Sequence, residues 1–302
     1  MDLLLRTVGL TKAYPGVVAL DELTIDVTPG TVGLVGANGA GKTTLFRIML
    51  GLTQPDSGSI EVAGVDVASD PIGVRTRLGF MPEHDCLPTD QTAADIVATL
   101  GELGGLPPRA ARQRASDVLD LVGLDEARFR PIEGFSTGMR QRTKLAQAIV
   151  GDPEVVLLDE PTAGLDPAGR EEMLALIERL STFGISIVMA THLLDDVQLV
   201  CDQVVMLDGG QLVTAGRTGA LVEATGTVSV DAGGRTDALL DALQQTGLTT
   251  EAMVDGSVAV DTAGDDDLDW IVAAVAAAGL PLHRLSPRNR SLDDVFLDRA
   301  GR

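Results

Sequence analysis

A glycine-rich segment is the first stretch of this chain whose residues could do chemistry. It reads Gly36-Ala37-Asn38-Gly39-Ala40-Gly41-Lys42-Thr43-Thr44 and fits the pattern G-x-x-x-x-G-K-S/T. Its glycines let backbone N–H groups converge on phosphate oxygens, and the start of the following helix adds partial positive charge. We expect Lys42 to reach the β- and γ-phosphates and the Thr43 hydroxyl to ligate Mg²⁺. The segment therefore predicts a nucleotide site.

An acidic pair, Asp159-Glu160, directly follows the apolar run 155–158. A carboxylate at the end of a buried strand lies at the sheet edge where Mg²⁺ is held, so Asp159 is a candidate metal ligand. Glu160 is placed to polarise an attacking water. Such a pair is often merely solvated, but the glycine-rich loop upstream and Pro161-Thr162 downstream favour the catalytic interpretation.

Two single residues could complete the site. His192 follows the predicted strand 185–190 through Thr191, and Tyr14 is the only tyrosine of the chain. A lone histidine is often structural, and a surface tyrosine often only packs. The face of an aromatic ring can also stack on adenine.

The stretch from Phe135 to Asp166 resembles the signature, Walker B and D-loop sequence of ATP-binding-cassette (ABC) ATPases. It reads Phe-Ser-Thr-Gly-Met from Phe135, Leu-Leu-Asp-Glu-Pro from Leu157 and Ala-Gly-Leu-Asp from Ala163. The resemblance covers roughly residues 3–220, with each landmark present once and in order. It implies an ATP hydrolase that uses ATP and Mg²⁺.

The resemblance also implies a role for each site residue. His192 matches the switch histidine that contacts the γ-phosphate, and Tyr14 matches the aromatic residue that stacks on adenine. Ser136 and Gly138 would bind the γ-phosphate held by another subunit, and Asp166 would shape that composite site. The expected catalytic residues are Glu160, His192 and Lys42; the nucleotide-binding residues are Tyr14, Gly36, Asn38, Gly39, Ala40, Gly41, Lys42, Thr43, Thr44, Glu83, Ser136, Gly138 and Asp166; the metal ligands are Thr43, Asp159 and Glu83.

Because each motif occurs once, two chains must supply two sites. The resemblance therefore implies an ATP-dependent head-to-tail dimer, and a heterodimer with another cassette stays possible. Partnership with a separately encoded membrane permease would hold the chain at the cytoplasmic face of the cell membrane.

At two motifs the sequence differs from the common cassette sequence and resembles that of the ABC-2 exporter group. Thr137 and Met139 replace residues of the usual Leu-Ser-Gly-Gly-Gln signature, and Glu83 stands where glutamine is usual. The segment 291–297 near the end also resembles this group, and it could equally be an ordinary amphipathic helix. The group exports drugs, ions, polysaccharides or lipids. An importer subunit and a cassette ATPase acting on nucleic acid or ribosomes are the alternatives, and the sequence does not indicate the cargo.

Strands and helices alternate in a way that positions these motifs. The fold class is α/β: a P-loop ABC ATPase domain with a RecA-like core, an antiparallel β subdomain and a helical subdomain at about 90–150. Apolar and polar patterns predict strands at 3–10, 19–27, 32–35, 59–62, 77–81, 155–158, 185–190, 203–207 and 211–215. They predict helices at 42–50, 92–103, 108–121, 168–180 and from about Thr137 to before Gly151.

The pattern changes after about residue 222. Residues 227–285 read as strand, helix, strand, strand, helix, strand, with Asp255-Gly256 as a hairpin turn. This order predicts a ferredoxin-like module. We therefore expect an ATPase domain at 1–222 and an accessory domain at 223–302 that ends in a helix at 291–299. The accessory domain could strengthen the dimer or sense a small ligand.

The amino-acid composition and net charge restrict the kinds of molecule that this chain is expected to bind. The chain of 302 residues has a net charge of −21 and contains three lysines, Lys12, Lys42 and Lys144. Binding of nucleic acid through its phosphates needs basic patches, so the charge disfavours nucleic acid as a partner. The acidity alone is also compatible with simple solubility or a salt-rich host. No apolar run approaches the roughly 18 residues of a membrane span, no signal peptide is visible, and the two cysteines show no metal spacing, so we expect a soluble intracellular chain.

Overall fold

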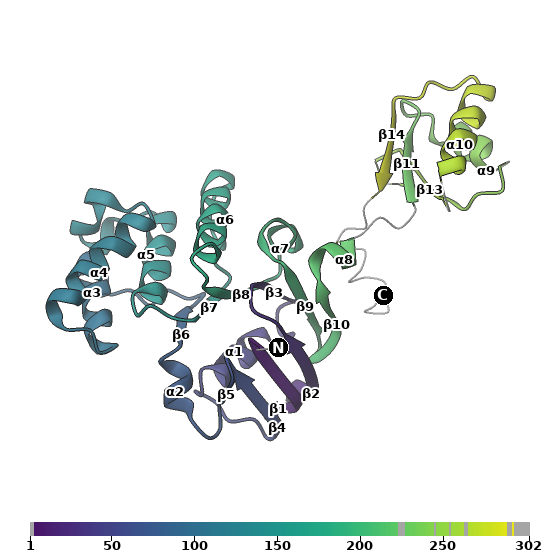
Figure 1. Ribbon diagram of the computed structural model, residues 1–302. Coiled ribbons are helices and arrows are strands. Elements are labelled where there is room, and N and C mark those ends of the chain that lie inside the picture. Colours follow the sequence, from purple (N-terminus) through teal and green to yellow (C-terminus); the bar gives the residue numbers. More distant parts are fainter. Residues whose placement is uncertain are drawn as a thin grey trace. The chain divides into compact units, whose positions relative to one another are not determined.

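The computed structural model describes residues 3–222, 227–244, 246–253, 255–262, 265–288 and 292. Within these residues the chain forms two compact units that divide between Thr218 and Gly219. Each unit has its own sheets and core (Figure 1). The first unit carries the glycine-rich loop, the acidic pair, His192, Tyr14 and the stretch from Phe135 to Asp166.

A six-stranded sheet forms the centre of the first unit. Its order is β10-β9-β3-β8-β7-β6, with parallel pairing from β9 to β6 and antiparallel pairing between β9 and β10. The strands are β3 (Thr31–Val35), β6 (Leu78–Met81), β7 (Val155–Asp159), β8 (Ser186–Thr191), β9 (Gln203–Asp208) and β10 (Gln211–Arg217). Strands β3, β7 and β8 are buried throughout, as expected for parallel strands covered on both faces.

The register of this sheet brings the motifs to one edge. Val35 pairs with Thr191, Asp159 pairs with Ala190, and Met81 pairs with Leu158. The residues that follow β3, β6, β7 and β8 therefore emerge side by side at the carboxyl ends of the parallel strands. That edge is where ligands bind in open α/β sheets.

A second, antiparallel sheet packs over the glycine-rich loop and its helix. Its order is β2-β1-β4-β5, formed by β1 (Leu5–Tyr14), β2 (Val17–Val27), β4 (Ser57–Val62) and β5 (Val65–Asp66). Helix α1 (Lys42–Met49) contributes Leu45, Phe46, Ile48 and Met49 to one core that includes residues of both sheets. This shared core fixes where α1 begins.

Helices form the rest of the first unit. Helices α3 (Ala93–Leu103), α4 (Pro108–Leu121) and α5 (Thr137–Ile149) pack on one another, and two 3₁₀ turns, Asp125–Phe129 and Ile132–Gly134, lead into α5. Helix α6 (Pro167–Ser181) separates β7 from β8. Two further helices, α2 (Pro71–Arg75) and α7 (Leu194–Val200), were not predicted because five and seven residues are too few to show a clear helical period.

The second unit has the predicted ferredoxin-like topology. Its sheet order is β12-β13-β11-β14, and every pair is antiparallel. The elements are β11 (Thr227–Asp231), α9 (Thr236–Gln244), β12 (Thr250–Ala252), β13 (Val258–Asp261), α10 (Asp265–Ala277) and β14 (Arg284–Arg288), preceded by α8 (Thr218–Val222). Of the predicted terminal helix at 291–299, all but Leu292 lies outside the described residues. In the part of the chain that is described, no helix has the length and apolar character needed to cross a membrane.

Candidate functional site

The glycine-rich loop joins β3 to α1 in the geometry that a phosphate requires. Gly41 caps α1 with a φ of 107°, and a Cβ there would come within 2.5 Å of the Ala19 carbonyl oxygen. At Gly36 a Cβ would lie 2.4 Å from the Leu207 carbonyl oxygen. Among the described residues no side chain caps the first turn of α1, so its N–H groups are available to an anion.

The other residues of this loop differ in their exposure. Ala37, Asn38 and Gly39 are exposed, whereas Ala40 is buried and donates its N–H to Ala37 O at 3.0 Å. Thr43 is exposed and Thr44 is half-buried, both in the first turn of α1. The middle of the loop is therefore accessible from solvent.

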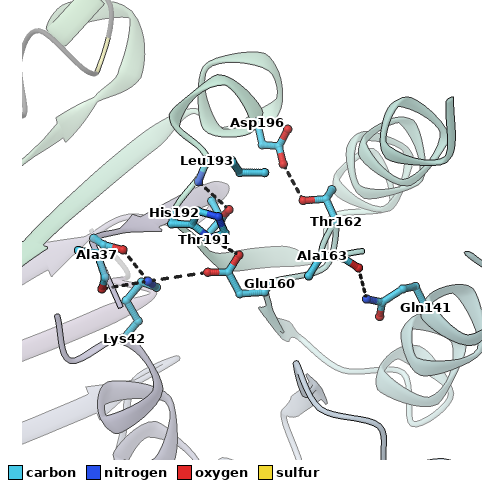
Figure 2. Close-up of polar contacts among 11 residues, drawn as sticks. Ala37, Lys42, Gln141, Glu160, Thr162, Ala163, Thr191, His192, Leu193 and Asp196 are labelled. Atoms are coloured by element: carbon cyan, nitrogen blue, oxygen red, sulfur yellow. Dashed lines mark hydrogen bonds and ion pairs between the residues drawn. The ribbon is translucent and has the colours of Figure 1, made fainter. Parts of the chain in front are cut away.

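Lys42 bends back onto its own loop. Its Nζ donates to Gly36 O at 2.6 Å and lies 3.8 Å from Oε1 of Glu160 (Figure 2). The side chain is buried, so its charge acts in a weakly screened environment. The ammonium is thus held between the glycine-rich loop and the acidic pair.

Asp159 sits in a crowded acidic environment. Burial, together with the charges of Glu83 and Glu160, raises the pKa of Asp159 to about 6, although Lys42 and a hydrogen bond with Thr43 oppose the shift. A divalent cation would relieve this repulsion. No three His, Cys, Asp or Glu side chains in the described ranges are grouped closely enough to hold a metal by themselves. This donor set nevertheless fits Mg²⁺, which proteins hold through one or two carboxylates together with nucleotide phosphates.

Glu160 is held by both its backbone and its carboxylate. Its φ is 49°, an uncommon value for a residue with a side chain, and its N–H donates to Ala190 O at 2.9 Å. Oε2 lies 3.0 Å from Nδ1 of His192 (Figure 2). Strained backbone persists where the surroundings enforce it, and here the Ala190 hydrogen bond and the His192 contact hold the turn.

Tyr14 lies at the end of β1, paired with Val17, in a turn braced by Asp56. The Asp56 carboxylate accepts from Ala13 N at 2.7 Å and from Lys12 Nζ at 2.8 Å, and these contacts lower the pKa of Asp56. The Lys12 ammonium lies 5.6 Å from the centre of the Tyr14 ring. The ring is partly exposed and is therefore accessible to a planar ligand.

Ser136, Gly138 and Asp166 form a separate cluster. They line an open groove of about 550 Å³ between α5 and α6, together with Met139, Leu165 and neighbouring residues. Ser136 caps α5 by accepting from Met139 N at 3.3 Å, and Asp166 caps α6 by accepting from Gly169 N at 3.0 Å. None of the residues that line this groove belongs to the glycine-rich loop, so within one chain the groove is not part of the Lys42 site.

The comparisons with known proteins agree with this geometry. A sequence profile for the family described as "ABC transporter" matches residues 20–163. The daunorubicin resistance ATP-binding protein DrrA3 of Streptomyces coeruleorubidus is 34% identical over 97% of this chain and 94% of its own length. This chain belongs to the ABC transporter family. It is an ATP-hydrolysing subunit, as the sequence predicted.

Two further relatives extend the family assignment. The Nod factor export ATP-binding protein I of Ralstonia nicotianae is 33% identical over 72% of this chain and 68% of its own length. Among solved structures, cbiO1 from Clostridium perfringens, part of the ABC transporter complex cbiONQ, covers 73% of this chain and 91% of its own at a TM-score of 0.67 and 29% identity. The ABC ATPase fold class is therefore confirmed.

Sequence reasoning missed one buried cation in this ABC ATPase. Lys144 on α5 is 2% exposed, and its Nζ donates to the carbonyl oxygens of Pro82 and Glu83 at 2.8 Å each. Burial lowers the pKa of Lys144. The Glu83 side chain is exposed, so the structure fixes this residue through its backbone. The lysine count singled out Lys144, but no sequence pattern linked it to Glu83.

A second missed group lies behind the acidic pair. Asp196 on α7 is fully buried, and its Oδ2 accepts from Thr162 Oγ1 at 2.7 Å (Figure 2). Its Oδ1 accepts from Arg170 Nε at 2.5 Å. Gln141 on α5 donates to Ala163 O at 3.0 Å. The turn that follows Glu160 is thus held from α5 on one side and from α7 on the other.

A larger hollow of about 670 Å³ lies away from all of these residues. Arg6, Arg77, Glu154 and Ser186 contribute to its lining, close to the amino ends of parallel strands β6, β7 and β8. Ligands of open α/β sheets bind at the opposite, carboxyl ends. This hollow therefore lies at the end of the sheet opposite to Lys42, Asp159 and Glu160.

Proposed function

We propose that this chain is the ATP-hydrolysing subunit of an ABC-2-type exporter. The observation that carries the proposal is the match to the daunorubicin resistance ATP-binding protein, which spans 97% of this chain and so includes most of the second unit. Thr137, Met139 and Glu83 also support it, because these residues at these motif positions resemble the ABC-2 exporter group. A cargo of drug, lipid, polysaccharide or ion would be selected by the permease.

The residues at the sheet edge supply the groups that hydrolysis needs. The glycine-rich loop and Lys42 bind the phosphates, and Tyr14 stacks on adenine. The Glu160 carboxylate accepts a hydrogen bond from the attacking water, and His192 contacts the γ-phosphate while holding Glu160 in place. Catalysis by this site rests on positioning and charge, because phosphoryl transfer requires little covalent chemistry from a protein.

Mg²⁺ would be held by Thr43 and Asp159, with Glu83 near enough to contribute. When bound, the cation neutralises charge on the phosphate oxygens. The raised pKa of Asp159 supports this assignment, because crowded carboxylates favour a cation among them.

The groove with Ser136, Gly138 and Asp166 supports a head-to-tail dimer. Its lining includes no residue of the Lys42 loop of the same chain, but it includes the N-terminus of α5, which favours a phosphate. We infer that this groove meets the nucleotide of a second chain. The second unit would strengthen that dimer, and its removal should weaken ATP-dependent association in a sizing experiment.

An experiment on the intact transporter tests the proposal. The chain should co-purify with a six-helix permease encoded next to it, and vesicles with both proteins should move cargo away from the ATP-exposed side. Transport toward the ATP side would indicate an importer. ATP hydrolysis stimulated by nucleic acid or ribosomes, without permease binding, would contradict a role in transport.

A further inference from the structure

Three side chains of helix α5 hold the segment after β6. Arg140 Nη1 lies 3.5 Å from Asp85 Oδ2, Lys144 Nζ donates to the carbonyls of Pro82 and Glu83, and Gln147 Oε1 lies 3.9 Å from Cys86 Sγ. Positions 140, 144 and 147 share one face of a helix, because residues three and four apart are neighbours on it. Segment 82–86 is therefore attached to α5 along about two turns.

Lys144 is the buried member of this set. Its ammonium makes two 2.8 Å hydrogen bonds to adjacent carbonyls, whereas the Arg140–Asp85 pair is largely exposed. A hydrogen bond from a charged donor is stronger than a neutral one, and burial reduces its screening by water. Lys144 therefore contributes the firmest link between α5 and the backbone of Glu83.

The same lysine lies beside the acidic cluster. The charges of Asp85, Glu83 and Asp159 all act on its ammonium. Of the three lysines of the chain, Lys42 and Lys144 are the buried ones, and both face this cluster. Lys144 thus offsets part of the negative charge that Glu83 adds.

Helix α5 also carries the groove residues at its first turn. Ser136 caps the helix two turns before Lys144. A shift of the Glu83 backbone would pull on Lys144 and, through the rigid helix, on Ser136.

We propose that Lys144 is a positioning residue that links the backbone at Glu83 to the first turn of α5, so that nucleotide arriving at one cluster reorients the other. This inference rests on the proposed nucleotide site. Lys144 acts through the carbonyls of Pro82 and Glu83, to which its Nζ donates. Coupling of this kind requires an element on which both sites act, and here that element is α5.

Hydrogen exchange on the full-length chain tests the link, at a dilution at which a sizing column shows only monomer with MgATP, so that no partner's nucleotide contacts Ser136 directly. In wild type, addition of MgATP should slow amide exchange both in segment 82–86 and in residues 136–140. In Lys144→Met, segment 82–86 should still respond, while the response at 136–140 should shrink by about fivefold or more. Retention of both responses in Lys144→Met would overturn the proposal.

Two further variants separate the link from general stability. Thr143→Val removes the 2.8 Å hydrogen bond from Thr143 Oγ1 to Met139 O on the same helix without touching segment 82–86, and it should keep both responses. If Lys144→Met does not fold, Lys144→Gln supplies a neutral donor of shorter reach and should show the same loss at 136–140. An intact response in that variant would likewise count against the link.

The charge contribution has its own readout. If the Lys144 ammonium offsets the charge of Glu83, Lys144→Met should weaken MgATP binding, measured with a fluorescent ATP analogue. The same substitution should weaken binding less in a Glu83→Gln background, because the neutral glutamine adds no negative charge for the ammonium to offset. Equal losses in both backgrounds would eliminate the charge role. Absence of ATP binding in wild type would instead contradict the proposed function, so the two failures can be distinguished.

Discussion

The Nδ1 atom of His192 lies 3.0 Å from Oε2 of Glu160, while the other carboxylate oxygen of Glu160 lies 3.8 Å from Nζ of Lys42. The carboxylate thus joins the loop after β3 to the loop after β8 through the end of β7 (Figure 2). Its position is set twice, by these contacts and by the left-handed backbone at Glu160. A carboxylate held in this way needs little rearrangement when a reaction begins, so the energy cost of reorganisation is small.

Glu160→Gln should abolish turnover and preserve the fold. Glutamine keeps the shape of glutamate and can still contact His192, but it accepts a proton from water far less readily. We expect ATP hydrolysis to fall by roughly 100-fold or more and an ATP-bound dimer to accumulate in a sizing column. Rapid hydrolysis by this variant would remove Glu160 from the catalytic role.

Two inactive variants should complement each other if Ser136 serves the partner's nucleotide. Lys42→Ala damages the phosphate loop and Ser136→Arg blocks the groove. In a mixed head-to-tail dimer both defects fall in one composite site and the other site is intact, so about a quarter of all sites recover in an equal mixture. Phosphate release by the mixture measures this. Failure of well-folded variants to recover any activity would place Ser136 in its own chain's site.

The raised pKa of Asp159 makes the nucleotide-free chain sensitive to pH. Because the folded chain holds this proton more tightly than the unfolded chain, the protonated carboxyl stabilises the fold fully below its ordinary pKa near 3.8, and this contribution is lost as the pH rises through about 6. Asp159→Asn should therefore be more stable than wild type at pH 7.5, on the order of 1–2 kcal/mol. Urea unfolding without magnesium or nucleotide measures it. The gain should shrink toward pH 4.5, and a pH-independent difference would refute this origin.

Asp196→Ala should destabilise the chain because it leaves two partners of a buried carboxylate unsatisfied. Thr162 is buried, and Arg170 would lose its buried counter-charge. The expected loss in free energy of unfolding is about 2–4 kcal/mol. The adjacent Asp195→Ala is the matched control, since Asp195 is exposed and should cost less than about 0.5 kcal/mol. Similar losses in both variants would mean that the Thr162–Asp196–Arg170 contacts contribute nothing specific.

Local sequence predicted much of the fold because the signals were strong. A short apolar run such as 155–158 favours a strand covered on both faces, and β7 is such a strand. The Asp208-Gly209-Gly210 sequence favours a tight turn, and it joins β9 to β10. The six elements of the second unit also follow the predicted order. Helix α7 was missed because its seven residues, Leu194–Val200, are too few to show a clear helical period.

The contacts within the site depend on distances between segments far apart in the chain. Lys144 and Glu83 are separated by 61 positions, and Thr162 and Asp196 by 34. No local pattern specifies such pairs, since they arise from the sheet register and from the packing of α5 and α7. The glycine-rich loop and the acidic pair were visible because each carries its residues within a few consecutive positions.

The separate core of the second unit has a consequence for the history of the chain. Val230, Leu239, Val260 and Ile271 pack in a cluster distinct from the core that surrounds α1. An exchange of genetic material at the junction after α8 would therefore divide no sheet described in the structure. Recombination could replace this module as a whole, so that the same motor could be paired with different C-terminal additions in different lineages.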